Sequence, residues 1–226
     1  MLWARDVTHT FGAIRALDGI TFSLQRGQTL AIFGPNGAGK TTLLKVLAGL
    51  IRPVRGDARV EGGRRAIGWI GHQSQLYGDL TVVENLRFWA SLYDVSQPDL
   101  QRRQDDLLVR LGLQRQAHQT VRTLSRGQMQ RAAIARALIH DPIVLLLDEP
   151  FTGLDRLAAE ELRELLARLA AQGRATVLVT HNVEEGTELA TEVAFMRSGR
   201  FVAYGPRAGR DAAVLAAAYR EAVAGG

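Results

Sequence analysis

The sequence contains no cysteine among its 226 residues. Disulfide bonds and thiolate metal sites are therefore excluded, and a reducing compartment is compatible with the composition. The N-terminal residues lack the positively charged and then apolar pattern of a signal peptide. No apolar run approaches the ~20 residues that a membrane-spanning helix needs, so we expect the chain itself to be soluble.

The composition does provide apolar material for a core, with 46% hydrophobic residues. The length suits one large α/β domain, or a domain with a subdomain. The net charge of +5 is compatible with nucleic acid, an anionic membrane surface or an acidic nucleotide as a partner. Because net charge informs on association rather than on fold, we interpret any single arginine between positions 102 and 136 as part of a solvated face.

A glycine-rich stretch over residues 34–42 lies between an apolar run that predicts a strand and a run that predicts a helix. In this context the G-x-x-x-x-G-K-[ST] pattern binds phosphate. The glycines let backbone N–H groups line an anion site, and the positive end of the helix points there too. Lys40 adds a full charge for the β- and γ-phosphates, and the Thr41 hydroxyl is suited to bind Mg²⁺. The predicted nucleotide-binding residues are Gly34, Pro35, Asn36, Gly37, Ala38, Gly39, Lys40, Thr41 and Thr42.

A second apolar run, residues 143–147, predicts a strand buried on both faces of a parallel sheet. It ends in Asp148 and Glu149, at the edge of the sheet where ligands bind in open α/β folds. Two adjacent carboxylates repel and are costly to desolvate, so a structural role alone does not explain them. Asp148 is suited to bind Mg²⁺, and Glu149 is suited to accept a proton from an attacking water.

Local signals predict the remaining elements. A buried strand over residues 176–180 ends at His181, which places this histidine on the phosphate side of the sheet. Capping boxes at Thr81 and at Ser125 predict the starts of two helices. Further along, Ser198 and Gly199 predict a hairpin between two short strands, and an alanine-rich helix follows.

The order of these motifs resembles the ATP-binding-cassette (ABC) ATPase family. The stretch 34–42 matches the phosphate loop of that family, and residues 124–128 (LSRGQ) match its signature. The other matches are Gln73 for the Q-loop, residues 145–150 (LLLDEP) for the strand with its carboxylates, residues 153–155 (GLD) for the D-loop, and Thr180–His181 for the switch histidine. Six motifs in the right order are far more specific than any one of them.

The resemblance implies a fold and a division of the chain. We expect an α/β fold in which a P-loop NTPase core sheet carries an N-terminal antiparallel β subdomain and a helical insert. The whole of residues 1–226 would form one ABC nucleotide-binding domain. Its catalytic core with the β subdomain would comprise approximately residues 1–72 and 141–226, and the helical subdomain with the signature approximately residues 73–140.

The resemblance also implies site residues, with ATP and Mg²⁺ as ligands. Glu149, His181 and Gln73 would be catalytic, and Thr41, Gln73 and Asp148 would hold the metal. Phe11 falls where the family has an aromatic residue that stacks on adenine.

In the family, two such domains face each other head to tail, which implies a homodimer here. The D-loop residue Asp155 and the signature residues would then meet the nucleotide of the other copy. Those signature residues are Ser125, Arg126, Gly127 and Gln128. Arg126 stands where the signature usually has glycine. Its side chain either points outward or adds charge near the nucleotide, and the sequence does not decide between the two.

The function that the resemblance implies is that of an ATPase subunit that powers a separate integral membrane transporter from the cytoplasmic side of the inner membrane. Repair ATPases of the family carry long coiled coils, and translation members have two cassettes in one chain. Neither feature is present, so no nucleic-acid partner is expected. A small-molecule kinase would lack the signature. Residues 71–73, 80–88 and 148–155 also resemble the haem-exporter ATPases of bacterial cytochrome c maturation, although the ATPases of drug, lipid and nutrient transporters share many of the same residues.

Overall fold

The computed structural model describes residues 1–71 and 73–224. His72, part of the stretch that resembles haem exporters, lies outside the described residues. The strands are β1 (Leu2–Phe11), β2 (Ile14–Leu24), β3 (Thr29–Phe33), β4 (Arg55–Val60), β5 (Ile67–Ile70), β6 (Val144–Asp148), β7 (Ala175–Thr180), β8 (Glu192–Arg197) and β9 (Arg200–Pro206). The helices are α1 (Lys40–Leu47), α2 (Val82–Leu92), α3 (Gln97–Arg110), α4 (Arg126–Leu138), α5 (Arg156–Ala171), α6 (Val183–Leu189) and α7 (Ala212–Ala224).

The core is a six-stranded sheet with the order β5-β6-β7-β3-β8-β9. The central strands β3, β6 and β7 are buried at every residue, as expected for parallel strands that are covered on both faces. The predicted hairpin of β8 and β9 forms, but β8 also pairs in parallel with β3. β8 is therefore also a strand of the core sheet, which the hairpin signal alone did not indicate.

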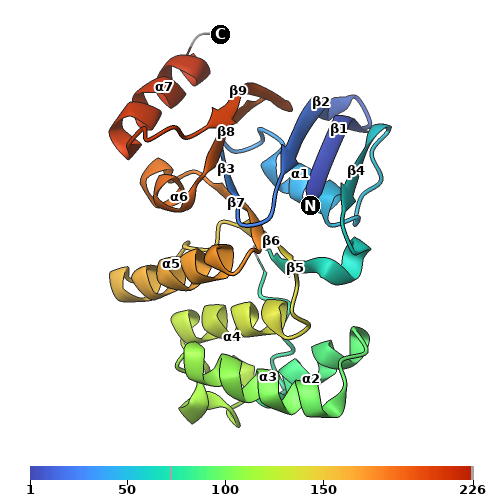
Figure 1. Ribbon diagram of the computed structural model, residues 1–226, viewed down its shortest axis with the longest axis vertical. Helices are drawn as coiled ribbons and strands as arrows, with labels where there is room; N and C mark the ends of the chain where they lie inside the picture. Colours follow the sequence, from blue (N-terminus) through green and yellow to red (C-terminus); the bar gives the residue numbers. More distant parts are fainter. Residues whose placement is uncertain (72, 225–226) are drawn as a thin grey trace.

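A smaller antiparallel sheet, β2-β1-β4, lies on one side of the core (Figure 1). Its strands are long, since β1 has 10 residues and β2 has 11. The pairing register shifts between Ala4 and Val7, and Asp6 in that interval has a positive φ of 48°. This bulge bends β1 without ending it.

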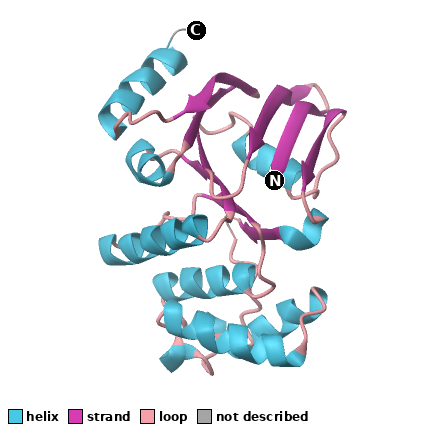
Figure 2. Cartoon of the chain, in the orientation of Figure 1, coloured by secondary structure: helices cyan, strands magenta, loops and turns pink. Residues whose placement is uncertain are grey.

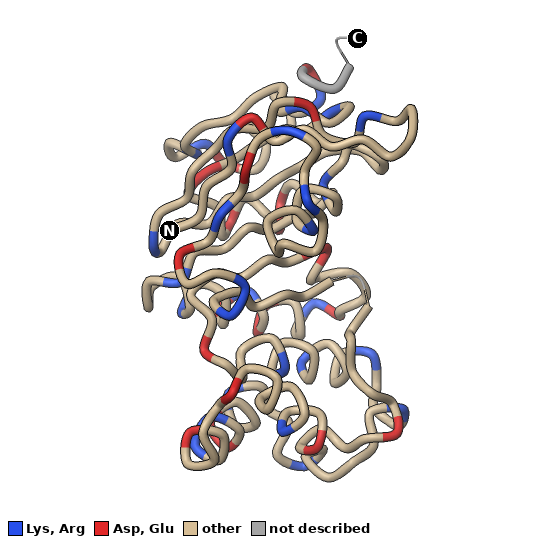
Figure 3. The backbone as a smooth tube through the Cα atoms, turned by 90° about the vertical axis from the view of Figure 1, so that its right-hand side faces the viewer, with Lys and Arg blue, Asp and Glu red and all other residues tan. Residues whose placement is uncertain are grey.

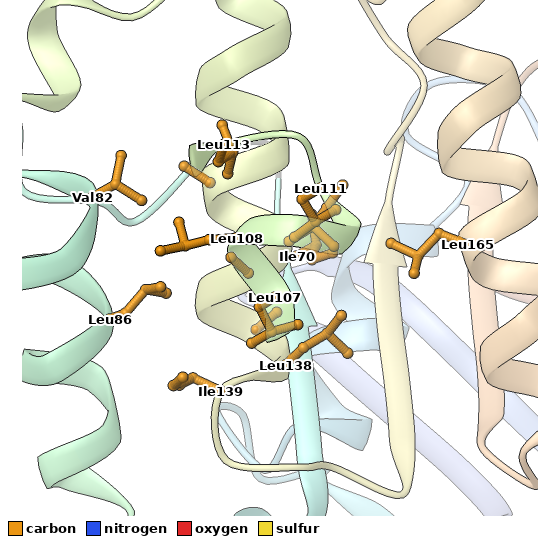
Figure 4. Close-up of a cluster of buried hydrophobic side chains, with 14 of the residues drawn as sticks. Ile70, Val82, Leu86, Leu107, Leu108, Leu111, Leu113, Leu138, Ile139 and Leu165 are labelled. Carbon is orange, nitrogen blue, oxygen red and sulfur yellow. The ribbon is translucent and has the colours of Figure 1, made fainter. Parts of the chain in front are cut away.

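The helices α2, α3 and α4 gather at the end of the molecule away from the small sheet (Figure 2). Both predicted capping boxes are present, at Thr81 for α2 and at Ser125 for α4. Figure 4 shows that leucines of α3 and α4 meet Val82 and Leu86 of α2 in one apolar cluster, which continues to Ile70 of β5. This cluster joins the helical end of the molecule to the core sheet.

Basic and acidic residues are interspersed along the chain (Figure 3). In the arginine-rich part, Arg102, Arg110 and Arg131 pair with nearby acidic residues. Arg136 differs from these three, because it is 4% exposed and its guanidinium lies over the ring of Trp89. No helix in the part of the chain that the structure describes combines the length and the apolar character needed to cross a membrane.

Candidate functional site

The carboxyl ends of three neighbouring strands bring the predicted site residues to one edge of the sheet. β3 leads into the phosphate loop, β6 ends at Asp148 and β7 ends directly before His181. Since β6, β7 and β3 are adjacent and parallel, these loops must emerge side by side, as they do in open α/β folds.

The backbone of the phosphate loop requires glycine at two positions. A Cβ atom at Gly34 would overlap the backbone oxygen of Met196, and one at Gly39 would overlap the backbone oxygen of Ala16. Gly39 also has a φ of 104° and precedes α1 without a side-chain cap. The first N–H groups of α1 therefore have no side-chain partner from the N-cap, which is the arrangement that receives an anion.

Lys40 lies inside this loop and is only 7% exposed. Its Nζ donates hydrogen bonds to the backbone oxygens of Gly34, at 2.6 Å, and of Pro35, at 3.1 Å. Burial lowers the pKa of Lys40, while the nearby carboxylates of Glu149 and Asp148 oppose that shift. The backbone oxygens of the loop thus hold the ammonium group at the start of α1.

Thr41 and Asp148 form the part of the site that fits a metal ion. The Thr41 hydroxyl donates to Oδ2 of Asp148 at 2.9 Å, and Asp148 is buried at the end of β6. Among the described residues there is no cluster of three or more His, Cys, Asp or Glu side chains suited to a metal. One hydroxyl and one carboxylate oxygen suit Mg²⁺, which usually takes few protein ligands and completes its shell with phosphate and water.

Glu149 has a φ of 52°, in the left-handed region. That conformation costs a non-glycine residue roughly 1–2 kcal/mol, and strain of this kind gathers at functional sites. The backbone N–H of Glu149 donates to the oxygen of Val179 at 2.9 Å. Its Oε1 lies 3.0 Å from Nδ1 of His181. The side chains of Glu149 and His181 are 20% and 68% exposed, so this pair faces the open side of the site.

These groups share one pocket of about 450 Å³. Phe11, which is 51% exposed, lies in its lining together with the phosphate loop, Asp148, Glu149 and His181. Sequence reasoning missed four further lining residues, namely Ile14, Arg15, Ala16 and Thr152. The first three belong to β2 and carry no motif. The structure alone points to Ile14, because an isoleucine that is 71% exposed is unusual.

Other predicted residues lie outside this pocket. Gln73 is exposed and is not part of the pocket lining. Ser125 and Gln128 cap α4 and Asp155 caps α5, and none of the three lines the pocket. Arg126 does not project away from the protein, because its guanidinium lies against Gly153. The structure therefore brings the phosphate loop, Asp148, Glu149, His181 and Phe11 together in this pocket, whereas no signature residue lines it.

Comparison with known proteins agrees with this geometry. A family model described as "ABC transporter" matches residues 17–152. The Nod factor export ATP-binding protein I of Ralstonia nicotianae is 37% identical over 204 residues, which cover 86% of this chain and 64% of that protein. The chain thus spans a little under two thirds of the length of this relative. Other relatives are named for import of sulfate or thiosulfate and for export of fluoroquinolones.

Two solved structures match almost throughout. One is titled as the ATP-binding subunit of an ABC transporter; its TM-score is 0.90 at 30% identity, with 99% of each chain covered. The other is a post-hydrolysis dimer of the ATP-binding cassette MJ0796 bound to ADP and Pi, with a TM-score of 0.82 at 28% identity, covering 91% of this chain and 98% of that one.

The chain belongs to the ABC transporter family. Specifically, it is an ATPase domain of that family, whose fold is the predicted core sheet with an antiparallel β subdomain and helices. Its ligands are ATP and Mg²⁺, as is general for such domains.

Proposed function

We propose that this chain is the ATP-hydrolysing subunit of a membrane transporter and that it works as a pair of copies. The observation that carries the proposal is the meeting of Lys40, the Thr41–Asp148 pair and the Glu149–His181 pair in one pocket. A cation, a metal-binding pair and a carboxylate with a histidine partner are what phosphoryl transfer to water needs.

Each group has a distinct role in this proposal. Lys40 and the backbone N–H groups of α1 bind the β- and γ-phosphates of ATP. Thr41 and Asp148 would hold Mg²⁺, which when bound would supply positive charge against the phosphates. Gln73 lies outside the pocket lining, and we propose it as a further ligand. Glu149 accepts the proton of the attacking water, and its 3.0 Å contact with His181 fixes the direction of the carboxylate. Phe11 offers an exposed ring face for adenine.

A second copy completes the site. Ser125, Arg126, Gly127 and Gln128 surround the exposed start of α4, and a Cβ at Gly127 would meet nothing within 4 Å. Nothing in the described part of the chain therefore demands glycine at this position, and a close approach by phosphate from outside supplies a reason. Asp155 lies in the loop that follows Glu149, and in this proposal it contacts the second copy together with the signature. We propose a homodimer that is peripheral to the cytoplasmic side of the inner membrane and associated with integral membrane subunits.

The dependence of turnover on protein concentration tests the shared site. ATP hydrolysis per subunit should fall as the purified chain is diluted below the dimer dissociation constant, because half of each site is then lost. Sedimentation at the same concentrations reports whether dimer is present. Turnover that stays constant down to concentrations where only monomer sediments would contradict the proposal.

For the cargo we propose haem export for cytochrome c maturation. This rests on the resemblance of residues 80–88 and 148–155, together with Gly71 and Gln73, to haem-exporter ATPases. The relatives above are named for other cargoes, so export or import of a drug, lipid or nutrient is the alternative. Deleting the gene in its host should remove holocytochromes c while b-type cytochromes persist. Normal c-type cytochromes in that strain would remove haem as cargo and leave the ATPase proposal intact.

A further inference from the structure

Arg126 is the first residue of α4, inside a turn that is already fixed without it. The N–H of Gln128 donates to Oγ of Ser125 at 3.3 Å, and the N–H of Ser125 donates to Oε1 of Gln128 at 2.9 Å. Capping therefore does not involve the Arg126 side chain. In the part of the chain that the structure describes, Arg126 also has no hydrogen bond or ion pair of its own.

What the Arg126 side chain contacts is Gly153, in the loop between β6 and α5. A Cβ atom at Gly153 would overlap Nε, Cζ and Nη2 of Arg126, all at closely similar distances. The flat face of the guanidinium therefore covers the Cα atom of Gly153, rather than a single nitrogen pointing at it. Gly153 has a positive φ of 77°, so glycine is favoured there for its backbone as well as for this close approach.

The same loop is held by α4 at a second point. Nε2 of Gln130 donates to the backbone oxygen of Pro150 at 2.9 Å. Arg126 also lines a small cavity of about 120 Å³ together with Asp148, Glu149 and Thr152. The start of α4 and the loop over residues 150–155 are thus packed together directly beside the catalytic carboxylate.

We propose that Arg126 is a positioning residue that braces the loop over residues 150–155 against the start of α4. The brace makes the signature and the loop that carries Asp155 one preformed surface for the ATP of the second copy. Preorganisation strengthens binding because the ordering cost is met before association. This inference rests on the proposed function for its consequence, but the brace itself exists within one copy.

The first test measures the loop in the monomer. Thr152 and Leu154 donate backbone hydrogen bonds to Glu149 and Phe151, so their amides report on the order of the loop. Arg126→Ala should accelerate hydrogen exchange of these amides about tenfold, the change that ~1.4 kcal/mol produces. Arg122→Ala is the matched control, because Arg122 is exposed and pairs with Asp79. Unchanged exchange in Arg126→Ala would overturn the brace.

The second test measures the dimer in a Glu149→Gln background with ATP. Arg126→Ala should raise the dimer dissociation constant about tenfold by sedimentation, with ATP affinity of the monomer unchanged.

Arg126→Lys should not restore the dimer, because an ammonium group has no flat face. Gly153→Ala displaces the guanidinium, so combining it with Arg126→Ala should add little beyond Gly153→Ala alone. Full rescue by lysine would overturn the inference. Failure of the parent Glu149→Gln to dimerise would contradict the proposed function, while the exchange test still decides on the brace.

Discussion

Replacing Lys40 with methionine separates the binding role of this residue from its structural role. The ammonium group donates to two backbone oxygens in the free protein, and it would exchange these for phosphate oxygens when ATP binds. A hydrogen bond to a charged partner contributes about 1.5–3 kcal/mol. Losing contacts to two phosphates, less the two contacts present in the free protein, should cost about 2–4 kcal/mol, or roughly a 30- to 1,000-fold loss of ATP affinity.

The stability of the Lys40→Met variant should change little. Methionine has a similar length and removes a desolvated cation, whose burial already lowers the pKa of Lys40. Against this gain, the oxygens of Gly34 and Pro35 lose a donor, so the net change in unfolding free energy should stay within about 1 kcal/mol.

Calorimetric titration with ATP, together with urea unfolding, measures both effects. The chain has one other lysine, Lys45, which is exposed on the same helix, so Lys45→Met is the matched control. ATP affinity that is unchanged in Lys40→Met would refute the placement of the phosphates.

Two further predictions concern stability. Burial lowers the pKa of His140 to about 4: Nε2–H donates to the oxygen of Ile67 at 3.0 Å and the buried Nδ1 has no partner among the described residues. Because the pKa in the folded state is below the ordinary value near 6.5, this histidine should contribute stability above pH 6.5 and lose about 3 kcal/mol of it as the pH falls to 4. In His140→Phe the unfolding free energy should fall less over that range than in the parent protein, and equal pH dependence would contradict the assignment. Asn85 is fully buried, and its side chain forms hydrogen bonds with the backbone of Tyr77 and of Thr81 at the start of α2. In Asn85→Leu the unfolding free energy, measured by urea unfolding, should fall by about 2–4 kcal/mol. A fall below about 1 kcal/mol would contradict a stabilising role for these bonds.

Motifs with a local physical cause were predictable from the sequence. The phosphate loop, both capping boxes and the buried strand before Asp148 depend on residues close together in the chain, and the structure has all of them where they were expected. The starts of α2 and α4 agree with the prediction, because the caps Thr81 and Ser125 fix the point where each helix begins.

The remaining features depend on contacts that no local pattern encodes. The pairing of β8 with β3 joins segments more than 150 residues apart, and the hairpin signal at Ser198 indicated only the local partner. Glu149, which contacts His181, has a positive φ. No pattern in the sequence predicts this backbone conformation. The direction of Arg126 was open for the same reason, since it depends on the space above Gly153.

Trapping an ATP-bound dimer with Glu149→Gln tests the central claim most directly. Glutamine keeps the size and most hydrogen bonding of the side chain but cannot accept the proton of the attacking water. Hydrolysis should fall by about 10²–10⁴-fold, while ATP binding survives because Lys40, Thr41 and the backbone of the loop are unchanged. In size-exclusion chromatography with ATP and Mg²⁺, the variant should elute as a dimer that returns to monomer with ADP, whereas the parent protein should cycle back to monomer. Near-normal hydrolysis by Glu149→Gln with no trapped dimer would contradict the account, and it would make His181 the first residue to test as the base.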